Sequence, residues 1–205
     1  IDEVDLNDAP PRADLLAGLG GRMQEHIAAH LPPNRTDLRL WLGSAGAVAR
    51  AHYDKGHNIL CQLVGVKQVL VWRPRHWSRL HPFPATHAAH RQSQIPTRDL
   101  QAAVAGEGPA ARRWPLARGA RPALARLLPG DCLFIPAMWP HAVLAEKASV
   151  SVAAFSTSRE RARWAVAAWA PLPVGDGAVP TGMDSTCARA VAAGRLIRLV
   201  QDTAF

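Results

Sequence analysis

Several features are scarce in this chain of 205 residues: it has three cysteines, one tyrosine and only 16 acidic residues. No apolar run approaches the roughly 20 residues that a membrane-spanning helix needs, so we expect no membrane association. No signal-peptide pattern opens the chain, and its first residue, Ile1, indicates a processed or trimmed product. Hydrophobic residues nevertheless make up 48% of the chain, which supplies a core and excludes global disorder.

The deficit of acidic residues leaves a formal net charge of +8, because Lys and Arg together number 24. Most of the basic residues are arginines, and they are scattered rather than gathered in one run. Such a balance favours an acidic partner: nucleic acid, an anionic surface or an acidic peptide. Compositional drift is the alternative interpretation.

The cysteines (Cys61, Cys132 and Cys187) are odd in number and widely spaced, which fits neither a disulfide framework nor a zinc knuckle. Cys61 and Cys132 lie inside apolar runs, so we interpret them as small core residues. A reducing compartment follows as the expectation, and with it an intracellular location in the cytoplasm or nucleus.

Alternating apolar residues predict short strands in the middle of the chain, and helical patterns flank them. We expect strands at 38–42, 48–54, 132–136, 142–145 and 149–156, and a hairpin over 58–72 with its bend at 64–67. Helices are expected at 15–31, 98–104, 159–169 and 185–201. The chain divides into an N-terminal lead-in (1–37), a β domain (38–156) with a long irregular insert (75–125), and a helical C-terminal segment (157–205). The fold is therefore mainly β, a barrel or jelly roll.

The residues that carry chemistry are His52 and Asp54. Positions i and i+2 of a strand point to the same face, so an imidazole and a carboxylate would converge there. His141, from a distant strand, is the candidate third ligand. Two histidines and one carboxylate with open positions suit non-haem Fe(II), with zinc as the main competitor. A surface hydrogen bond between His52 and Asp54 is the alternative.

The motifs around these residues resemble, in order, the JmjC (cupin-like) group of Fe(II)- and 2-oxoglutarate-dependent oxygenases. They are Gly46 before Ala-His-Tyr-Asp at 51–54, Asn58, Gly-Val-Lys at 65–67, Val-Trp-Arg-Pro at 71–74, His-Arg-Gln-Ser-Gln at 90–94, Pro-Gly-Asp at 129–131, and Phe-Ile-Pro at 134–136 before Trp139 and His141. The closest branch is that of the asparaginyl hydroxylase of hypoxia-inducible factor. The resemblance implies a double-stranded β-helix with flanking N- and C-terminal helices.

By the same resemblance, His52, Asp54 and His141 would hold iron. Lys67 would anchor the distal carboxylate of 2-oxoglutarate, and Asn58 would hydrogen-bond near the cosubstrate and the metal. Arg91 and Gln92 would contact the substrate. Taken alone, Lys67 could cap an exposed hairpin turn, and the other three could be ordinary polar loop residues.

The chain also departs from the family pattern. Ala49 stands three residues before the first histidine, where Thr or Ser is frequent, and Ala154 stands where a polar residue is expected. The single tyrosine, Tyr53, is not placed to reach the cosubstrate. Trp41, Trp72 and Arg50 are candidate substitutes. Each lost hydrogen bond to a charged group costs about 1.5–3 kcal/mol of binding free energy.

The resemblance implies an enzyme, a dioxygenase that hydroxylates a protein side chain with Fe(II) and 2-oxoglutarate as cofactors. The alternatives are an RNA or tRNA-base hydroxylase of the same fold and a non-catalytic metal-binding module. Expected partners are a protein or peptide substrate, with RNA as the alternative, and a second copy of the chain. The copy would bind through C-terminal helices that bury Trp164, Trp169 and the stripe Leu196, Leu199 and Val200; packing of these helices on their own barrel is the alternative.

Overall fold

The computed structural model describes residues 2–5, 20–30, 36–84 and 87–158. The expected helices at 159–169 and 185–201, with their proposed dimer face, lie outside the described residues, and so does much of the helix expected at 15–31. Helix α2 (Gly21–His30) is the described part of the latter. No helix in the described ranges combines the length and apolar character of a membrane span.

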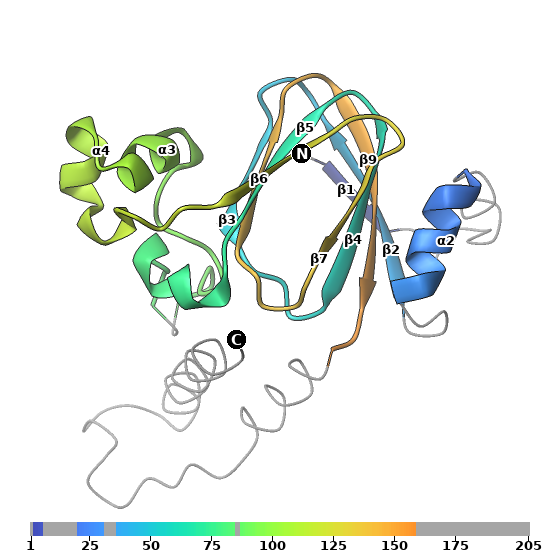
Figure 1. The fold of residues 1–205 in the computed structure, drawn as a ribbon, viewed down its shortest axis with the longest axis horizontal. Helices are drawn as coiled ribbons and strands as arrows, with labels where there is room; N and C mark the ends of the chain where they lie inside the picture. The colour runs from blue at the N-terminus through green and yellow to red at the C-terminus, as the bar shows by residue number, and fades with distance from the viewer. Residues whose placement is uncertain (1, 6–19, 31–35, 85–86, 159–205) are drawn as a thin grey trace, which may run out of the picture.

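In the described residues, nine antiparallel strands form two facing sheets, the jelly-roll architecture expected from the sequence (Figure 1). One sheet has the order β1-β2-β9-β4-β7 and the other β3-β8-β5-β6. The strands are β1 (Asp2–Asp5), β2 (Thr36–Gly43), β3 (Val48–His52), β4 (His57–Val64), β5 (Lys67–Val71), β6 (Ala123–Leu127), β7 (Cys132–Ile135), β8 (His141–Ala145) and β9 (Ser149–Ser156). Strands β1 and β6 escaped the sequence analysis, because neither shows an alternating apolar pattern.

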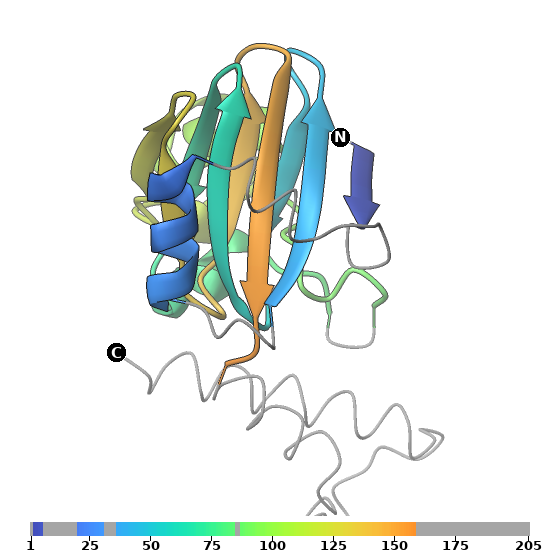
Figure 2. The ribbon, with the colours of Figure 1, turned by 90° about the vertical axis from the view of Figure 1, so that its right-hand side faces the viewer.

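Each sheet is covered on its outer face, so the molecule is layered helix, sheet, sheet, helix. Helix α2 packs Met23 and Ile27 against Leu38, Ile59 and Val152 of the five-stranded sheet (Figure 2). This contact explains the alternation in β9: its valines face α2, and Ser151 accordingly faces the barrel interior, where it donates a hydrogen bond to Gln62 Oε1.

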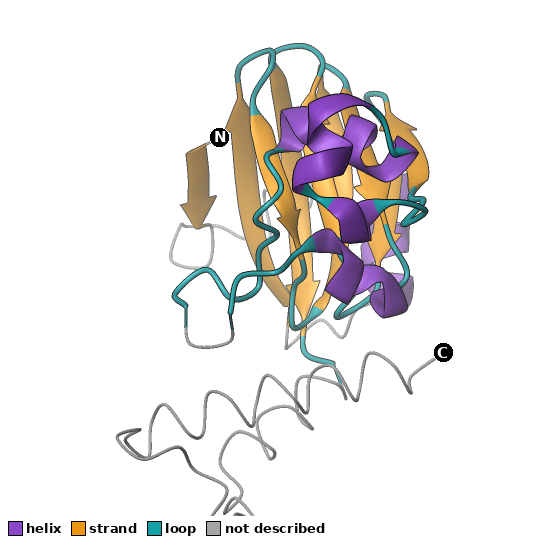
Figure 3. Cartoon of the chain, turned by 90° about the vertical axis from the view of Figure 1, so that its left-hand side faces the viewer, coloured by secondary structure: helices purple, strands orange, loops and turns teal. Residues whose placement is uncertain are grey.

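The other sheet is covered by residues 74–84 and 87–117, which form more regular structure than the irregular insert that we expected. They form 3-10 helices η2 (Pro74–Leu80) and η3 (Pro115–Ala117) and helices α3 (Thr97–Ala105) and α4 (Gly108–Arg113), as Figure 3 shows. Trp77, Leu100 and Trp114 pack here against Tyr53 and Trp72 of the barrel. The helix expected at 98–104 is confirmed.

The hairpin expected over 58–72 is wrong in one respect. A tight bend at Gly65 does separate two strands, but β4 pairs with β7 and β9, whereas β5 pairs with β6 and β8. The bend therefore carries the chain from one sheet to the other. Local sequence cannot distinguish these outcomes, because both need a turn between two apolar strands.

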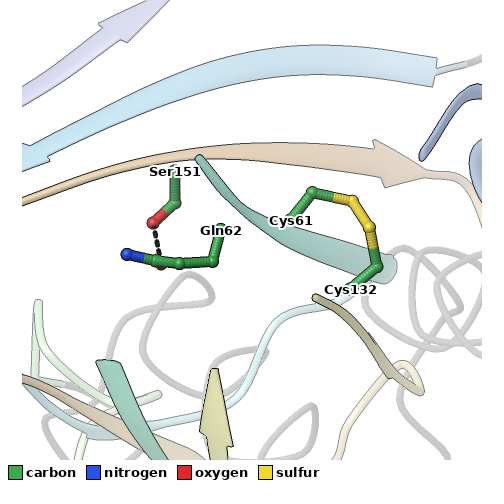
Figure 4. The surroundings of a disulfide bond; sticks show 4 residues. All are labelled: Cys61, Gln62, Cys132 and Ser151. Carbon is green, nitrogen blue, oxygen red and sulfur yellow. Dashed lines mark hydrogen bonds between the residues drawn. A yellow bond between two sulfur atoms is a disulfide. The ribbon is translucent and has the colours of Figure 1, made fainter. Parts of the chain in front are cut away.

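Cys61 lies in the core cluster under α2 and Cys132 packs against it, as expected, but the expectation that they fit no disulfide is wrong. Cys61 and Cys132 lie directly opposite each other on β4 and β7 and form a disulfide (Figure 4). They are 71 residues apart in sequence, so only the strand register brings them together. An oxidised pair removes the basis on which a reducing compartment was expected, and the cellular location stays a prediction.

Candidate metal centre

His52, Asp54 and His141 converge at one end of the barrel. His52 ends β3 and is paired with His141, the first residue of β8. Asp54 lies two residues past His52, in the turn before β4, and its backbone carbonyl accepts a hydrogen bond of 2.8 Å from the Met138 amide. One ligand atom from each of the three side chains lies within 4.8 Å of the other two. Among the described residues this is the only cluster of three potential metal ligands.

Both imidazoles are oriented by backbone carbonyls. His52 Nδ1 donates to the Arg50 carbonyl at 2.7 Å, and His141 Nδ1 donates to the Trp139 carbonyl at 3.0 Å. A carbonyl only accepts, so Nδ1 carries the hydrogen and Nε2 keeps its lone pair. This is the arrangement found around metal-bound histidines, where the outer hydrogen bond fixes the tautomer and the ring plane.

Burial keeps His141 neutral, since only 3% of it is exposed. Burial, reinforced by the neighbouring His52, lowers the pKa of His141, against the opposing effect of Asp54. Its Nε2 lies 3.6 Å from Asp54 Oδ2. Two imidazole nitrogens and a carboxyl oxygen thus form a compact donor set, which suits a divalent cation.

Arg91 and Gln92 come next to the triad because their segment pairs with the end of β3. Tyr53 and Arg91 exchange hydrogen bonds: the Tyr53 amide donates to the Arg91 carbonyl at 3.2 Å, and the Arg91 guanidinium donates to the Tyr53 carbonyl at 3.4 Å. Gln92 forms a β-bridge with His52. The guanidinium also lies 3.9 Å from Asp54 Oδ1.

All seven site residues that the sequence suggested line one cavity of about 950 Å³ between the sheets. They are His52, Asp54, Asn58, Lys67, Arg91, Gln92 and His141. Leu60, Ile135 and Val143 form its apolar wall. The cavity is large enough for a small cosubstrate together with one substrate side chain.

Lys67 is a buried cation inside this cavity. It is 2% exposed, forms no ion pair with any residue that the structure describes, and has its pKa lowered from 10.5 to about 8 by burial. The alternative that Lys67 merely caps an exposed turn is therefore excluded. Asn58 is 5% exposed, and its Oδ1 has no hydrogen-bond partner in the described structure. Two buried polar groups that find no partner in the described part of the chain suit a cavity that binds a polar ligand.

The departures from the family pattern differ in their consequences. Ala49 does line the cavity, so a hydroxyl is absent there. Ala154 instead packs in the cluster under α2, so the expectation that it removes a polar contact from the cavity is wrong. Tyr53 packs edge-on against Trp77, and burial raises its pKa to about 12. Of the suggested substitutes, Trp41 lines the cavity, whereas Trp72 donates to the Ala120 carbonyl on the outside of the barrel and Arg50 is exposed.

Sequence reasoning missed much of the cavity wall, including two charged residues of β2. Asp37 and Arg39 on β2 line it, and the Arg39 guanidinium lies 5.2 Å from the centre of the Phe155 ring, which also lines it. The alternation of β2 predicted a strand, but its inward face could be assigned only after its pairing with β9 was known.

The remaining histidines are not ligands in the described structure. His57 Nδ1 accepts a hydrogen bond of 3.1 Å from the Ala137 amide and so supports the loop that leads to His141. The histidines of the insert (His76, His81, His87 and His90) form no metal cluster.

The family model of the cupin-like domain matches residues 10–161, and the chain belongs to this family. It is 34% identical to the Jumonji C domain-containing protein 5 of Drosophila melanogaster over 58% of this chain and 27% of that protein. It is 32% identical to lysine-specific demethylase 8 of Xenopus tropicalis over 56% of this chain and 24% of that protein. It is also 32% identical to tRNA wybutosine-synthesizing protein 5 of Gallus gallus, over 56% of this chain and 31% of that protein.

The chain thus spans about a quarter to a third of the length of these curated relatives. The similarity places it among JmjC-containing proteins. It does not single out the asparaginyl hydroxylase branch, which stays a prediction.

Proposed function

We propose that this protein is an Fe(II)- and 2-oxoglutarate-dependent oxygenase that hydroxylates a protein side chain. One observation carries the proposal: three potential metal-ligand side chains share a single cavity with a buried lysine that has no ion-pair partner among the described residues. A lysine in that position without a bound anion costs stability, so its presence indicates a function.

The donor set fits a divalent iron better than zinc. Two imidazole nitrogens and one carboxylate on one side leave open positions for a chelating cosubstrate and dioxygen, whereas catalytic zinc is usually bound by three ligands with one open position. His52, Asp54 and His141 would hold the metal. When bound, the iron and 2-oxoglutarate supply the oxidising power for inserting oxygen into a C–H bond.

The chain's own residues bind and orient. Lys67 pairs with the distal carboxylate of 2-oxoglutarate, and Asn58 Oδ1 accepts a hydrogen bond at the metal end of the cavity. The wall formed by Leu60, Ile135 and Val143 excludes water from the reacting centre. Arg91 holds Asp54 through its guanidinium and, with Gln92, presents donors to an amide or backbone carbonyl of the substrate.

RNA is a second candidate substrate. The relative named as a tRNA wybutosine-synthesizing protein and the net charge of +8 favour it. Binding to RNA would weaken with rising salt, because released counterions drive it. Dimerisation through the C-terminal segment remains part of the proposal for this protein's partners.

The test is an anaerobic titration of the protein with Fe(II) and 2-oxoglutarate. The readout is the visible absorption band that arises from charge transfer between iron and the keto acid. A band that saturates with both components, and succinate release once dioxygen enters, is the expected result. Bound iron without a band or succinate would indicate the non-catalytic metal-binding module instead.

A further inference from the structure

The helical layer over the four-stranded sheet carries almost all of the protein's net charge. Between residues 73 and 121 there are nine arginines, no lysine and only two acidic residues, a net charge of +7 out of +8. Eight of these arginines are exposed: Arg73, Arg75, Arg79, Arg98, Arg112, Arg113, Arg118 and Arg121. Among them only Arg98 has a carboxylate within 4.0 Å in the described structure.

Several of these charges lie close together. Arg73, Arg75 and Arg79 are all near enough to His76 to lower its pKa, in addition to the effect of burial. The Arg79 guanidinium also donates to the Arg118 carbonyl at 3.4 Å, which brings η2 next to the segment after η3. Like charges at these separations repel one another, so an anionic partner would be stabilising.

An apolar groove of about 930 Å³ lies beside these arginines, between α3 and the outer face of the four-stranded sheet. Its lining includes Leu70, Leu100, Val104 and Leu124 together with Arg118 and Arg121. Leu124 is 63% exposed, which is unusual for a large apolar side chain beside other apolar residues. The groove thus combines an apolar lining with uncompensated positive charge.

We propose that this groove binds an acidic segment of a protein partner that carries apolar side chains. Arg118 and Arg121 pair with carboxylates of the segment, and its apolar side chains cover Leu70, Leu124 and Val104. The inference rests on the proposed function in one respect, since the partner is taken to be the protein that is hydroxylated.

Other occupants fit less well. RNA phosphates would satisfy the arginines but would leave the leucines uncovered. The chain's own residues 159–205 contain six arginines and four acidic residues, a net charge of +2, so they lack the complementary charge.

The experiment is a selection of random displayed peptides of about twelve residues against the intact protein. Enriched peptides are then labelled and titrated with wild type and variants. The double variant Arg118→Glu/Arg121→Glu reverses the charge of the groove, and Leu124→Ser removes an exposed apolar contact. The matched control, Arg75→Glu/Arg112→Glu, makes the same charge change at exposed arginines that do not line the groove. A labelled single-stranded RNA is titrated in parallel.

We expect enriched peptides with a net negative charge and leucine or aromatic residues. Their affinity should fall at least about tenfold with the groove double variant and about threefold or more with Leu124→Ser, and change less than about twofold with the control. The inference is overturned if no peptide is enriched, if enriched peptides are not acidic, or if RNA binds more tightly and Leu124→Ser has no effect on either ligand. All groove variants should retain the charge-transfer band between iron and 2-oxoglutarate, because none of the changed residues lines the metal cavity. Absence of the band in the wild type would contradict the proposed function and would leave the peptide result to test the groove.

Discussion

Asp54 Oδ2 lies 3.6 Å from Nε2 of His141, although the two residues are 87 positions apart in sequence, Asp54 in the turn before β4 and His141 at the start of β8. Register pairing of β3 with β8 and the hydrogen bond from Met138 to Asp54 hold the two side chains in place. The carboxyl oxygen and the imidazole nitrogen therefore face each other at a separation that a shared metal ion could bridge.

Asp54→Ala should abolish Fe(II) binding and turnover while the fold survives, because the side chain is 22% exposed and packs in no core cluster. Metal content after anaerobic loading and far-ultraviolet circular dichroism would measure the two effects. Asp37→Ala, which removes another carboxylate from the same cavity, is the matched control and should retain iron. Full turnover by Asp54→Ala would refute the metal assignment.

Lys67→Met should weaken 2-oxoglutarate binding at least about tenfold and leave iron bound, since it removes one charge-assisted contact. The same change should stabilise the ligand-free protein. The folded-state pKa of Lys67 is lowered from 10.5 to about 8, so the cost of burying its charge is present in full below pH 8 and is lost as the pH rises to 10.5.

The gain in unfolding free energy for Lys67→Met should therefore reach at most about 3 kcal/mol near neutral pH and shrink toward pH 10.5. Urea unfolding across this range would measure it. Lys147→Met, at an exposed lysine, should show neither effect. A Lys67→Met protein that binds 2-oxoglutarate normally would contradict the role of this lysine.

Individual strands and helices could be predicted from the sequence where the local pattern of apolar residues determines them. The strand at 149–156 and the helix near α3 could be predicted because each has the alternation or spacing of its element. Three features could not be predicted, because strand pairing and register determine them. They are the sheet to which β5 belongs, the disulfide and the outward direction of Ala154. His141 could be named as a candidate third ligand, but its convergence with His52 could not be predicted, because it depends on the pairing of β3 with β8.

Gly65→Ala should destabilise the fold far more than Gly46→Ala. Both glycines have a positive φ, +76° and +80°, so each substitution carries the same backbone cost of about 1 kcal/mol. At Gly65 an added Cβ would also overlap the Ala148 carbonyl oxygen, whereas at Gly46 it would meet nothing within 4 Å.

We expect a loss of unfolding free energy of about 3 kcal/mol or more at Gly65 and about 1 kcal/mol at Gly46. Thermal unfolding of the two variants side by side would measure the difference. Equal losses would mean that the bend between β4 and β5 is wider than the structure has it.

Cys132→Ser should lower the unfolding free energy by about 2–4 kcal/mol, because the disulfide closes a loop of 71 residues in the unfolded chain. Wild type with reductant should show the same loss, and Cys132→Ser should then respond no further to reductant. Thiol titration in denaturant should find one free thiol before reduction and three afterwards. Three thiols without reductant would show that Cys61 and Cys132 are unpaired in the purified protein.

Ala49→Thr should tighten 2-oxoglutarate binding. Ala49 lines the cavity on the strand that carries His52, so a hydroxyl there can donate to a bound carboxylate. One hydrogen bond to a charged group contributes about 1.5–3 kcal/mol, equivalent to an affinity gain of roughly ten- to a hundredfold. Ala49→Val has nearly the same shape without the hydroxyl and isolates the hydrogen bond from any change in packing.

Calorimetric titration of the iron-loaded proteins under nitrogen would give the three dissociation constants. If Ala49→Thr binds no more tightly than Ala49→Val, the carboxylate does not reach this part of the cavity, and Arg39 and Trp41 on the facing wall become the residues to test next.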